Sequence, residues 1–472
     1  MSSLSRRPPS PVLVFAIALP LLWLRFGHWF FLSLDEGIYL EGATRVARGE
    51  VPYRDFFVIT GPGAFWLYGA IFHFFGTSFA ASRAVLCVEL AAICTAICWL
   101  VGRTASAVFA VGTSLLYLAM LLTTLYPVYI THRWDSNAFA MLALCLVDRR
   151  PVLAGFLAAM AAWITPPLLL IAIALAFFAR LRPYAIGMAI ISVPAIALLI
   201  GQGALGPLVH SLLWDAGNYS AANRLSWGAL TMAFQSFRGP DLVHYVDSIL
   251  PAILPPVAIL LGVMAKARRL LLSAALAALA ACYPRFGAAQ LLFASAFFWV
   301  LAVASIPRRA QPWVAAAALL LAAGATAVGW PRENLKRIET PVGTLQVSRL
   351  HFLTLNDLLA ATHPGDRAFV YPYLPALYFA LDLRNPTRYA WLQPGMMADA
   401  DVRSAIASLK SNPPRWVIWH DFTQGYILKN WPNSDRTRLR FPEMETYLQA
   451  SYHVVVPDGV PTIGYKLMER NP

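Results

Sequence analysis

Long apolar stretches separated by short polar turns occupy most of the chain. A helix that crosses a bilayer needs about 20 mostly apolar residues. Apolar runs of this kind, several of them short, lie at residues 11–31, 79–101, 104–122, 137–147, 152–164, 167–179, 183–199, 249–265, 270–283, 287–306 and 314–328. The pattern predicts a polytopic α-helical membrane protein with about 11 crossings.

Basic clusters between the apolar runs predict which side each loop faces, because cytoplasmic loops carry an excess of Lys and Arg. If the N-terminus, with Arg6 and Arg7, lies inside, alternate crossings place every short basic loop inside as well. These loops contain Arg103 and residues 148–150, 180–182, 266–269 and 308–309. The same rule requires residues 64–75 to lie at the interface or dip partway into the membrane. It also requires residues 163–167, with their paired prolines, to form a turn.

The hydrophilic tail begins at about Pro331 and contains no apolar run long enough to span a membrane. Its expected strands lie at residues 368–371, 416–419, 452–456 and 462–467, and its expected helices end at about Leu409 and cover residues 443–450. Asp399 or Asp401 is expected to be the N-cap of the first helix. Strands alternating with helices predict a small α/β domain.

Two domains are therefore expected. A membrane domain covers residues 1–330, with outer loops at 32–78 and 203–247, and an α/β domain on the outer side covers residues 331–472.

Composition supports a membrane protein, since 58% of the residues are hydrophobic and only 13% are charged. The formal net charge of +13 would suggest nucleic-acid binding in a soluble protein. Here the cations lie in short loops between apolar runs, so no nucleic-acid partner is expected. The five cysteines lie in apolar segments without the spacing of a disulfide framework or zinc site, and we expect packed thiols.

The first outer loop carries the strongest candidate chemistry. Asp35 and Glu36 are adjacent carboxylates at a membrane boundary, where an ionisable residue is costly and is a functional candidate by default. Alternatively, both acids could cap a helix that starts at Gly37. A second cluster, Pro-Tyr-Arg-Asp-Phe-Phe at residues 52–57, follows, and Gly61-Pro62-Gly63 comes next.

These motifs resemble the first outer loop of GT-C fold integral-membrane glycosyltransferases. More narrowly, the pattern is similar to the bacterial relatives of dolichyl-phosphate-mannose protein mannosyltransferases, glycosyltransferase family 39. The segments Tyr-Pro-Arg-Phe at 283–286 and Phe-Val-Tyr-Pro-Tyr at 369–373 fit the same group. The chain departs from the protein mannosyltransferases at Ile38-Tyr39, where they carry His-Phe, which weakens the expectation of a protein acceptor.

The resemblance implies transfer of a sugar from a polyprenyl-phosphate donor to a lipid, glycan or protein acceptor on the periplasmic side of a bacterial inner membrane. It implies a multi-pass protein among membrane lipids, with a cytoplasmic N-terminus and a periplasmic tail. It also implies that an acid of the first loop serves the reaction, and Asp35 and Glu36 match the family's Asp-Glu motif.

Chemical argument assigns roles to individual residues. An acceptor hydroxyl needs a base within about 3 Å, so Asp35 is the expected base and Glu36 a catalytic residue that positions it. The departing phosphate needs a cation, and a guanidinium binds phosphate in a bidentate way. Arg285, Arg54 and Arg133 are the candidates for this contact. One acid that acts as a base, together with direct displacement of the phosphate, predicts that the configuration of the anomeric carbon is inverted.

Further residues are expected to form the substrate loop on the outer side: Tyr39, Tyr53, Asp55, His132, Asp135 and Tyr283. Several have structural alternatives. Asp55 could pair with Arg54, Asp135 could be an N-cap, and Arg285 could simply reach to the interface. His132 and Asp135 could hold a divalent metal, although two ligands three residues apart are a weak signal.

Two other classes of function compete with a glycosyltransferase. The chain could be a transporter or flippase of lipid-linked sugars, although it shows neither the paired repeats nor the midplane charges typical of transporters, apart from Glu89. It could also be a non-catalytic subunit of envelope-glycan assembly whose tail binds glycan. Release of polyprenyl phosphate from a sugar donor would distinguish the transferase from both.

Overall fold

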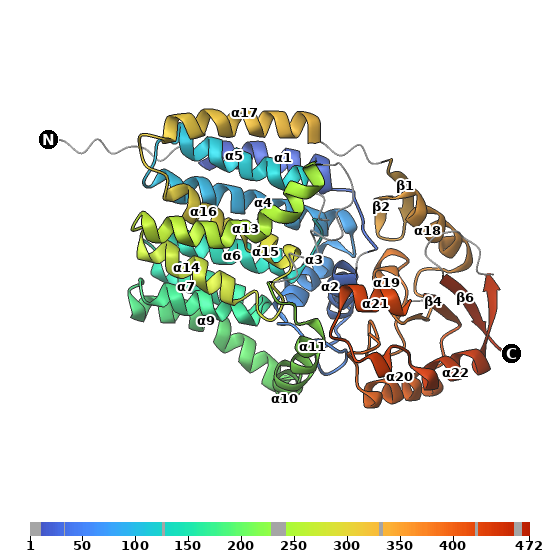
Figure 1. Ribbon diagram of the computed structural model, residues 1–472. Coiled ribbons are helices and arrows are strands. Elements are labelled where there is room, and N and C mark those ends of the chain that lie inside the picture. The colour runs from blue at the N-terminus through green and yellow to red at the C-terminus, as the bar shows by residue number, and fades with distance from the viewer. Residues whose placement is uncertain are drawn as a thin grey trace.

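The computed structural model describes residues 11–32, 34–124, 128–227, 242–329, 334–420, 423–456 and 465–472. Figure 1 shows a broad stack of helices joined to a smaller tail that contains the strands. Arg6, Arg7, the expected domain boundary near Pro331, part of the 203–247 loop and the start of the 462–467 strand lie outside the described residues.

Apolar helices pack side by side in the stack (Figure 1). They are α1 (Pro11–Phe26), α4 (Phe79–Gly102), α5 (Ala107–Thr123), α6 (His132–Leu146), α7 (Pro151–Ile164), α8 (Leu169–Ala176), α9 (Leu181–Gly201), α13 (Leu242–Met264), α14 (Arg269–Ala280), α15 (Ala288–Phe293), α16 (Ser295–Ala304) and α17 (Gln311–Gly329). Among the described residues, α4 and α9 are long and apolar enough to cross a membrane by length and composition. α4 lies centrally, since it contacts α1, α5, α6 and α16.

The expected turn between two helices at residues 163–167 is confirmed. α7 ends at Ile164, a single 3₁₀ turn covers Pro166–Leu168, and α8 follows and packs against α7. The apolar run at 287–306 contains two separate helices, α15 and α16. Ala294 between them has ψ of −2°, which interrupts the regular ladder of hydrogen bonds.

Basic turns from separate parts of the sequence meet at one end of the bundle. Arg103, Arg149, Arg268 and Arg308 line a common cavity of about 500 Å³. This grouping is what alternating crossings require of loops that share one side. Which side of a membrane this end faces stays a prediction.

Two further helices, α2 (Leu34–Ala47) and α3 (Gly63–Phe75), come from the expected first outer loop. They run side by side through close contacts at glycines. A Cβ on Gly42 would lie 2.5 Å from the Phe65 ring, and one on Gly69 would lie 2.6 Å from Val46. α3 ends in the exposed Phe74 and Phe75. Its expected position at the interface stays a prediction.

The tail contains a four-stranded sheet in the order β3-β4-β6-β5. The strands are β3 (Ala368–Tyr371), β4 (Trp416–His420), β5 (Tyr452–Val456) and β6 (Tyr465–Arg470). β3 and β4 are parallel, which requires a crossover connection, whereas β6 is antiparallel to both neighbours. The strands expected at 368–371, 416–419 and 452–456 are confirmed.

The tail also contains the helices α18 (Arg349–Ala361), α19 (Ala376–Ala380), α20 (Asp399–Ser411), α21 (Gln424–Asn430) and α22 (Pro442–Ser451). The expected N-cap of α20 is wrong, since Ala398 occupies that position. Asp401 instead accepts a hydrogen bond from the Ala398 N–H at 3.0 Å. A hairpin of β1 (Lys336–Thr340) and β2 (Gly343–Val347) was not predicted.

The tail contacts the bundle through its backbone. Phe30 N–H donates to the Gln346 carbonyl at 2.9 Å, and Phe57 N–H donates to the Arg388 carbonyl at 2.8 Å. The two parts also pack closely at Gly37 on α2, where a Cβ would lie 2.1 Å from the backbone nitrogen of Ala376 on α19. The first turns of α2 therefore rest directly on the tail.

Candidate active site

The paired acids lie in the first turn of α2. The helix begins at Leu34 rather than at the expected Gly37, so both acids belong to its first turn instead of preceding it. Acidic side chains are still favourable at this position, because the N-terminal end of a helix carries a partial positive charge. Neighbouring residues on a helix point in different directions, and the structure gives Asp35 and Glu36 different surroundings.

Glu36 is fully buried in a network that joins three segments. Its carboxylate lies 2.6 Å from the Arg83 guanidinium on α4, and Arg83 is also fully buried. The Phe31 and Ile130 N–H groups donate to Glu36 at 3.4 and 3.3 Å. Arg83 also donates to the Trp29 carbonyl at 2.6 Å. Burial raises the pKa of Glu36 to about 7, against the opposing effect of Arg83. Both Glu36 oxygens are thus occupied by structural contacts.

Asp35 has a more open environment. The Tyr129 hydroxyl donates to one of its oxygens at 3.3 Å, and its carboxylate forms no ion pair within the described residues. Burial raises the pKa of Asp35, whereas Arg133, the Tyr129 hydroxyl and Arg285 lower it. The net direction is upward, which suits a carboxylate that has to accept a proton.

Asp35 lines a small cavity of about 80 Å³. Sequence-predicted residues that share its wall are Tyr39, His132 and Arg133. Residues that the sequence did not single out as site residues complete it, among them Tyr219, Gln290, Tyr373 and Trp391. Tyr373 lies in the tail motif at 369–373, but Tyr219, Gln290 and Trp391 lie in segments without a readable signal. Aromatic rings with a few polar groups are the kind of lining that small-ligand sites usually have.

His132 and Asp135 have separate partners. The Nδ1 atom of His132 lies 2.7 Å from the Thr165 hydroxyl, whereas the Tyr68 hydroxyl donates to Asp135 at 2.9 Å. Thr131 is the N-cap of α6, so the expectation that Asp135 caps this helix is wrong. The described part of the chain contains no group of three His, Cys, Asp or Glu side chains placed to hold a metal ion.

The 52–57 cluster lies outside the lining of the Asp35 cavity, apart from Phe57. Arg54 forms an ion pair with Asp55 at 2.8 Å, and its Nη1 donates to the Gln202 carbonyl at 3.1 Å. This pairing lowers the pKa of Asp55, whose carboxylate also accepts from the Val51 N–H at 2.8 Å. Tyr53 is buried and its hydroxyl donates to the Thr60 carbonyl. These contacts organise the loop, as the structural alternative for Asp55 expected.

Arg285 approaches the site from the loop after α14. Its guanidinium donates to the Asn223 side chain at 2.5 Å and to the Asn430 carbonyl at 3.0 Å. It is therefore held between α11 (Ala216–Asn223) and the end of α21. The positive charge of Arg285 lowers the pKa of Asp35, although burial raises it more. Tyr283, by contrast, is 57% exposed and packs on Phe286, away from the cavity.

Solved structures of other proteins share this architecture at low sequence identity. ArnT from Cupriavidus metallidurans bound to undecaprenyl phosphate has a TM-score of 0.58 at 14% identity, with 97% of each chain covered. The Archaeoglobus fulgidus oligosaccharyltransferase in complex with zinc and sulfate has a TM-score of 0.51 at 12% identity, with 96% of this chain and 72% of that chain covered. No protein-family model and no curated protein sequence matches the chain. The chain therefore has the GT-C fold of integral-membrane glycosyltransferases, and its narrower resemblance to glycosyltransferase family 39 stays a prediction.

Proposed function

We propose that the chain transfers a sugar from a polyprenyl-phosphate donor to an acceptor hydroxyl on the periplasmic side of a bacterial inner membrane. The observation that carries this proposal is that the Asp35 carboxylate and Arg133 line the same cavity. The positive charge of Arg285 also acts on Asp35 and lowers its pKa. The fold agrees, since ArnT, one of the solved structures that share it, was crystallised with undecaprenyl phosphate. The N-terminus is cytoplasmic and the tail is periplasmic in this proposal.

The reaction follows from the charges at the site. Asp35 takes the proton of the acceptor hydroxyl while the acceptor oxygen forms a bond to the anomeric carbon. The bond from that carbon to the phosphate oxygen breaks, and its electron pair leaves with polyprenyl phosphate. Arg133 and Arg285 stabilise the negative charge of the departing phosphate. Attack opposite the leaving group inverts the anomeric carbon. Glu36 positions Asp35 through its contact with Arg83.

The site has to open before a sugar binds. Its volume of about 80 Å³ suffices for a few water molecules. Pockets for small ligands usually measure about 300–1,000 Å³. Opening requires movement of wall elements such as α11, which carries Tyr219, or the tail loop that carries Trp391.

The proposal is tested by donor turnover with the purified full chain in lipid nanodiscs. An undecaprenyl-phosphate sugar is the donor, and the release of undecaprenyl phosphate is measured. We expect release by the native protein, loss of release in Asp35→Asn, and near-normal release in Asp399→Asn. Asp399 is a matched control because its exposed carboxylate lies in the tail and pairs with Arg438. Movement of intact donor between leaflets without release would instead identify a transporter, and the absence of both would favour a non-catalytic subunit.

A further inference from the structure

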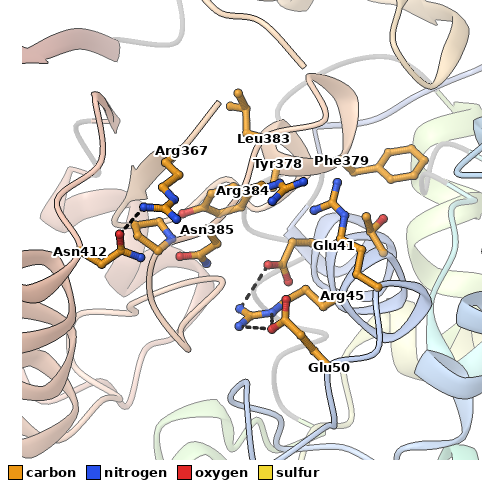
Figure 2. A pocket seen from close by; sticks show the side chains of 13 residues that line it. Glu41, Arg45, Glu50, Arg367, Tyr378, Phe379, Leu383, Arg384, Asn385 and Asn412 are labelled. Atoms are coloured by element: carbon orange, nitrogen blue, oxygen red, sulfur yellow. Dashed lines mark hydrogen bonds and ion pairs between the residues drawn. The ribbon is translucent and has the colours of Figure 1, made fainter. Parts of the chain in front are cut away.

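A second, larger cavity lies between α2 and the tail (Figure 2). Its volume is about 550 Å³, and its walls come from α2 and from the tail. Asp35 and Tyr39 are on the face of α2 toward the first cavity, whereas Glu41 and Arg45 line the second. The helical repeat of 3.6 residues places these two pairs on different faces. The second cavity is therefore separate from the candidate reaction site.

The basic side chains of the α2 wall already have carboxylate partners. Arg45 lies 2.7 Å from Glu50 and 3.5 Å from Glu41, as the dashed lines in Figure 2 show. Arg45 also donates to the Thr387 carbonyl at 3.0 Å. Arg48, at the end of the helix, forms an ion pair with Asp382 at 2.5 Å. This wall is close to electrical balance.

The tail wall has uncompensated positive charge. Arg367 and Arg384 are directly paired in an isolated parallel β-bridge, so their side chains start from adjacent backbone positions. No carboxylate of the described residues forms an ion pair with either one. Arg367 donates instead to the neutral Asn412 side chain. Both arginines are exposed, so solvent screens their mutual repulsion, and an anion that binds between them would gain charge-assisted hydrogen bonds from both.

Hydrogen-bonding groups near these arginines indicate what else the ligand carries. Glu41 is only 4% exposed, and its Oε2 atom has no hydrogen-bond partner. A buried carboxylate oxygen of this kind is costly unless a donor reaches it. Figure 2 shows the Glu41 carboxylate directed into the space between the two walls. A hydroxyl group on the ligand would supply the missing donor.

We propose that this cavity binds the phosphate of a hydroxylated phosphate ester, with the phosphate between Arg367 and Arg384 and a hydroxyl toward Glu41. Planar guanidinium groups match phosphate oxygens in a bidentate way. The volume of about 550 Å³ leaves room for a sugar or glycerol unit beside the phosphate. Two sources share this chemistry: a phosphorylated saccharide and a glycerophospholipid headgroup. The proposal does not depend on the reaction assigned to Asp35.

The test is binding to the purified full chain in uncharged nanodiscs. Inorganic phosphate and glucose 6-phosphate are each titrated against four proteins: the native chain, Arg384→Gln, Arg367→Gln and the control Arg436→Gln. Calorimetry measures the affinity of each probe, and thermal unfolding measures how much each probe stabilises the protein. Arg436 is an exposed tail arginine outside the cavity, so its variant has the same change of charge. We expect saturable binding by the native protein and the control. Loss of a charge-assisted contact should weaken binding at least about tenfold in each cavity variant.

Two further experiments test the role of Glu41 and distinguish a phosphorylated saccharide from a phospholipid headgroup as the ligand. Glu41→Gln should weaken the binding of glucose 6-phosphate more than the binding of inorganic phosphate, because only the ester carries sugar hydroxyl groups. Phosphatidylglycerol in the nanodiscs should compete with glucose 6-phosphate if the ligand is a headgroup, and should leave its affinity unchanged if the ligand is a phosphorylated saccharide. Equal affinity in the native protein and in both arginine variants, or no saturable binding of either probe by the native protein, would overturn the proposal.

Discussion

The Arg83 guanidinium on α4 lies 2.6 Å from the Glu36 carboxylate on α2, and neither side chain is accessible to solvent. This contact ties the first turn of α2 to the centre of the bundle. Asp35 is the preceding residue on that turn, so the ion pair also restricts where the Asp35 carboxylate can lie.

The Glu36–Arg83 pair gives the first prediction. Arg83→Gln leaves a buried carboxylate without its cation, and breaking a buried pair in this way costs about 3–5 kcal/mol. The double variant Arg83→Gln/Glu36→Gln should lose less stability than the sum of the single variants, because no uncompensated charge remains. Unfolding in detergent measures both effects. Arg415→Gln is the control, since its pair with Glu469 is exposed and is worth at most about 1 kcal/mol. Strict additivity in the double variant would contradict a coupled pair.

Asp35 gives the second prediction. Asp35→Asn keeps the size of the side chain but removes the base, and general-base catalysis is worth about 10²–10⁴-fold. Turnover should fall by about that factor, with folding and donor binding retained. Glu36→Gln should retain more turnover than Asp35→Asn and lose more stability. Near-normal donor release by Asp35→Asn would remove Asp35 from the mechanism.

The pH dependence of turnover gives the third prediction. A base must be deprotonated, and burial raises the pKa of Asp35, so the acidic limb of the rate profile should lie above the ordinary Asp value of about 3.9. Arg133 lowers the pKa of Asp35 by its positive charge. Arg133→Gln should therefore move the acidic limb to higher pH. A limb that stays in place, or moves to lower pH, would show that Arg133 does not act on the titrating group.

Arg285 gives the fourth prediction. Arg285→Lys keeps the charge but loses the planar fork, so donor use should weaken, and Arg285→Ala should weaken it further. The change should appear mainly as a higher KM for the donor. Asn223→Ala is the matched control, because it removes one structural partner of Arg285 and leaves the guanidinium in place. If Asn223→Ala and Arg285→Ala had the same effect, the role of Arg285 would be structural only.

Topology gives the fifth prediction. Single cysteines at Arg150 or Arg268 should resist a membrane-impermeant thiol reagent in intact cells, whereas cysteines at Arg224 or Pro364 should react. All four positions are exposed, and all five native cysteines are buried, so background labelling should be low. The reverse labelling pattern would place Asp35 and the tail on the cytoplasmic side and would contradict the proposed donor geometry.

Much of the fold follows from local sequence signals. Proline pairs and basic turns predict the hairpin at residues 163–167, and runs of β-branched and aromatic residues predict β3 and β4. The break at Ala294 has no such signal, because an Ala-rich apolar segment is a good helix former. The β1–β2 hairpin was missed since its strands are short and largely polar on one face.

The site was predictable only in part, for a different reason. Asp35, Tyr39, His132 and Arg133, which line one cavity, were singled out because their local motifs are polar next to apolar segments. Arg83 was missed because it is a lone cation inside an apolar helix, and its partner Glu36 is 47 residues away in sequence. Local motifs also suggested Arg54 and Tyr283, which the three-dimensional structure places away from the cavity.

Gly37 permits close packing between α2 and the backbone of the tail. With a hydrogen atom in place of a side chain, Gly37 lets the tail backbone touch the helix that carries Asp35. Any larger residue there would act as a wedge and separate the two surfaces. The tail also supplies Tyr373 and Trp391 to the cavity. A protein truncated before the tail would thus lose the backbone that packs against the first turns of α2, together with one wall of the cavity that Asp35 lines.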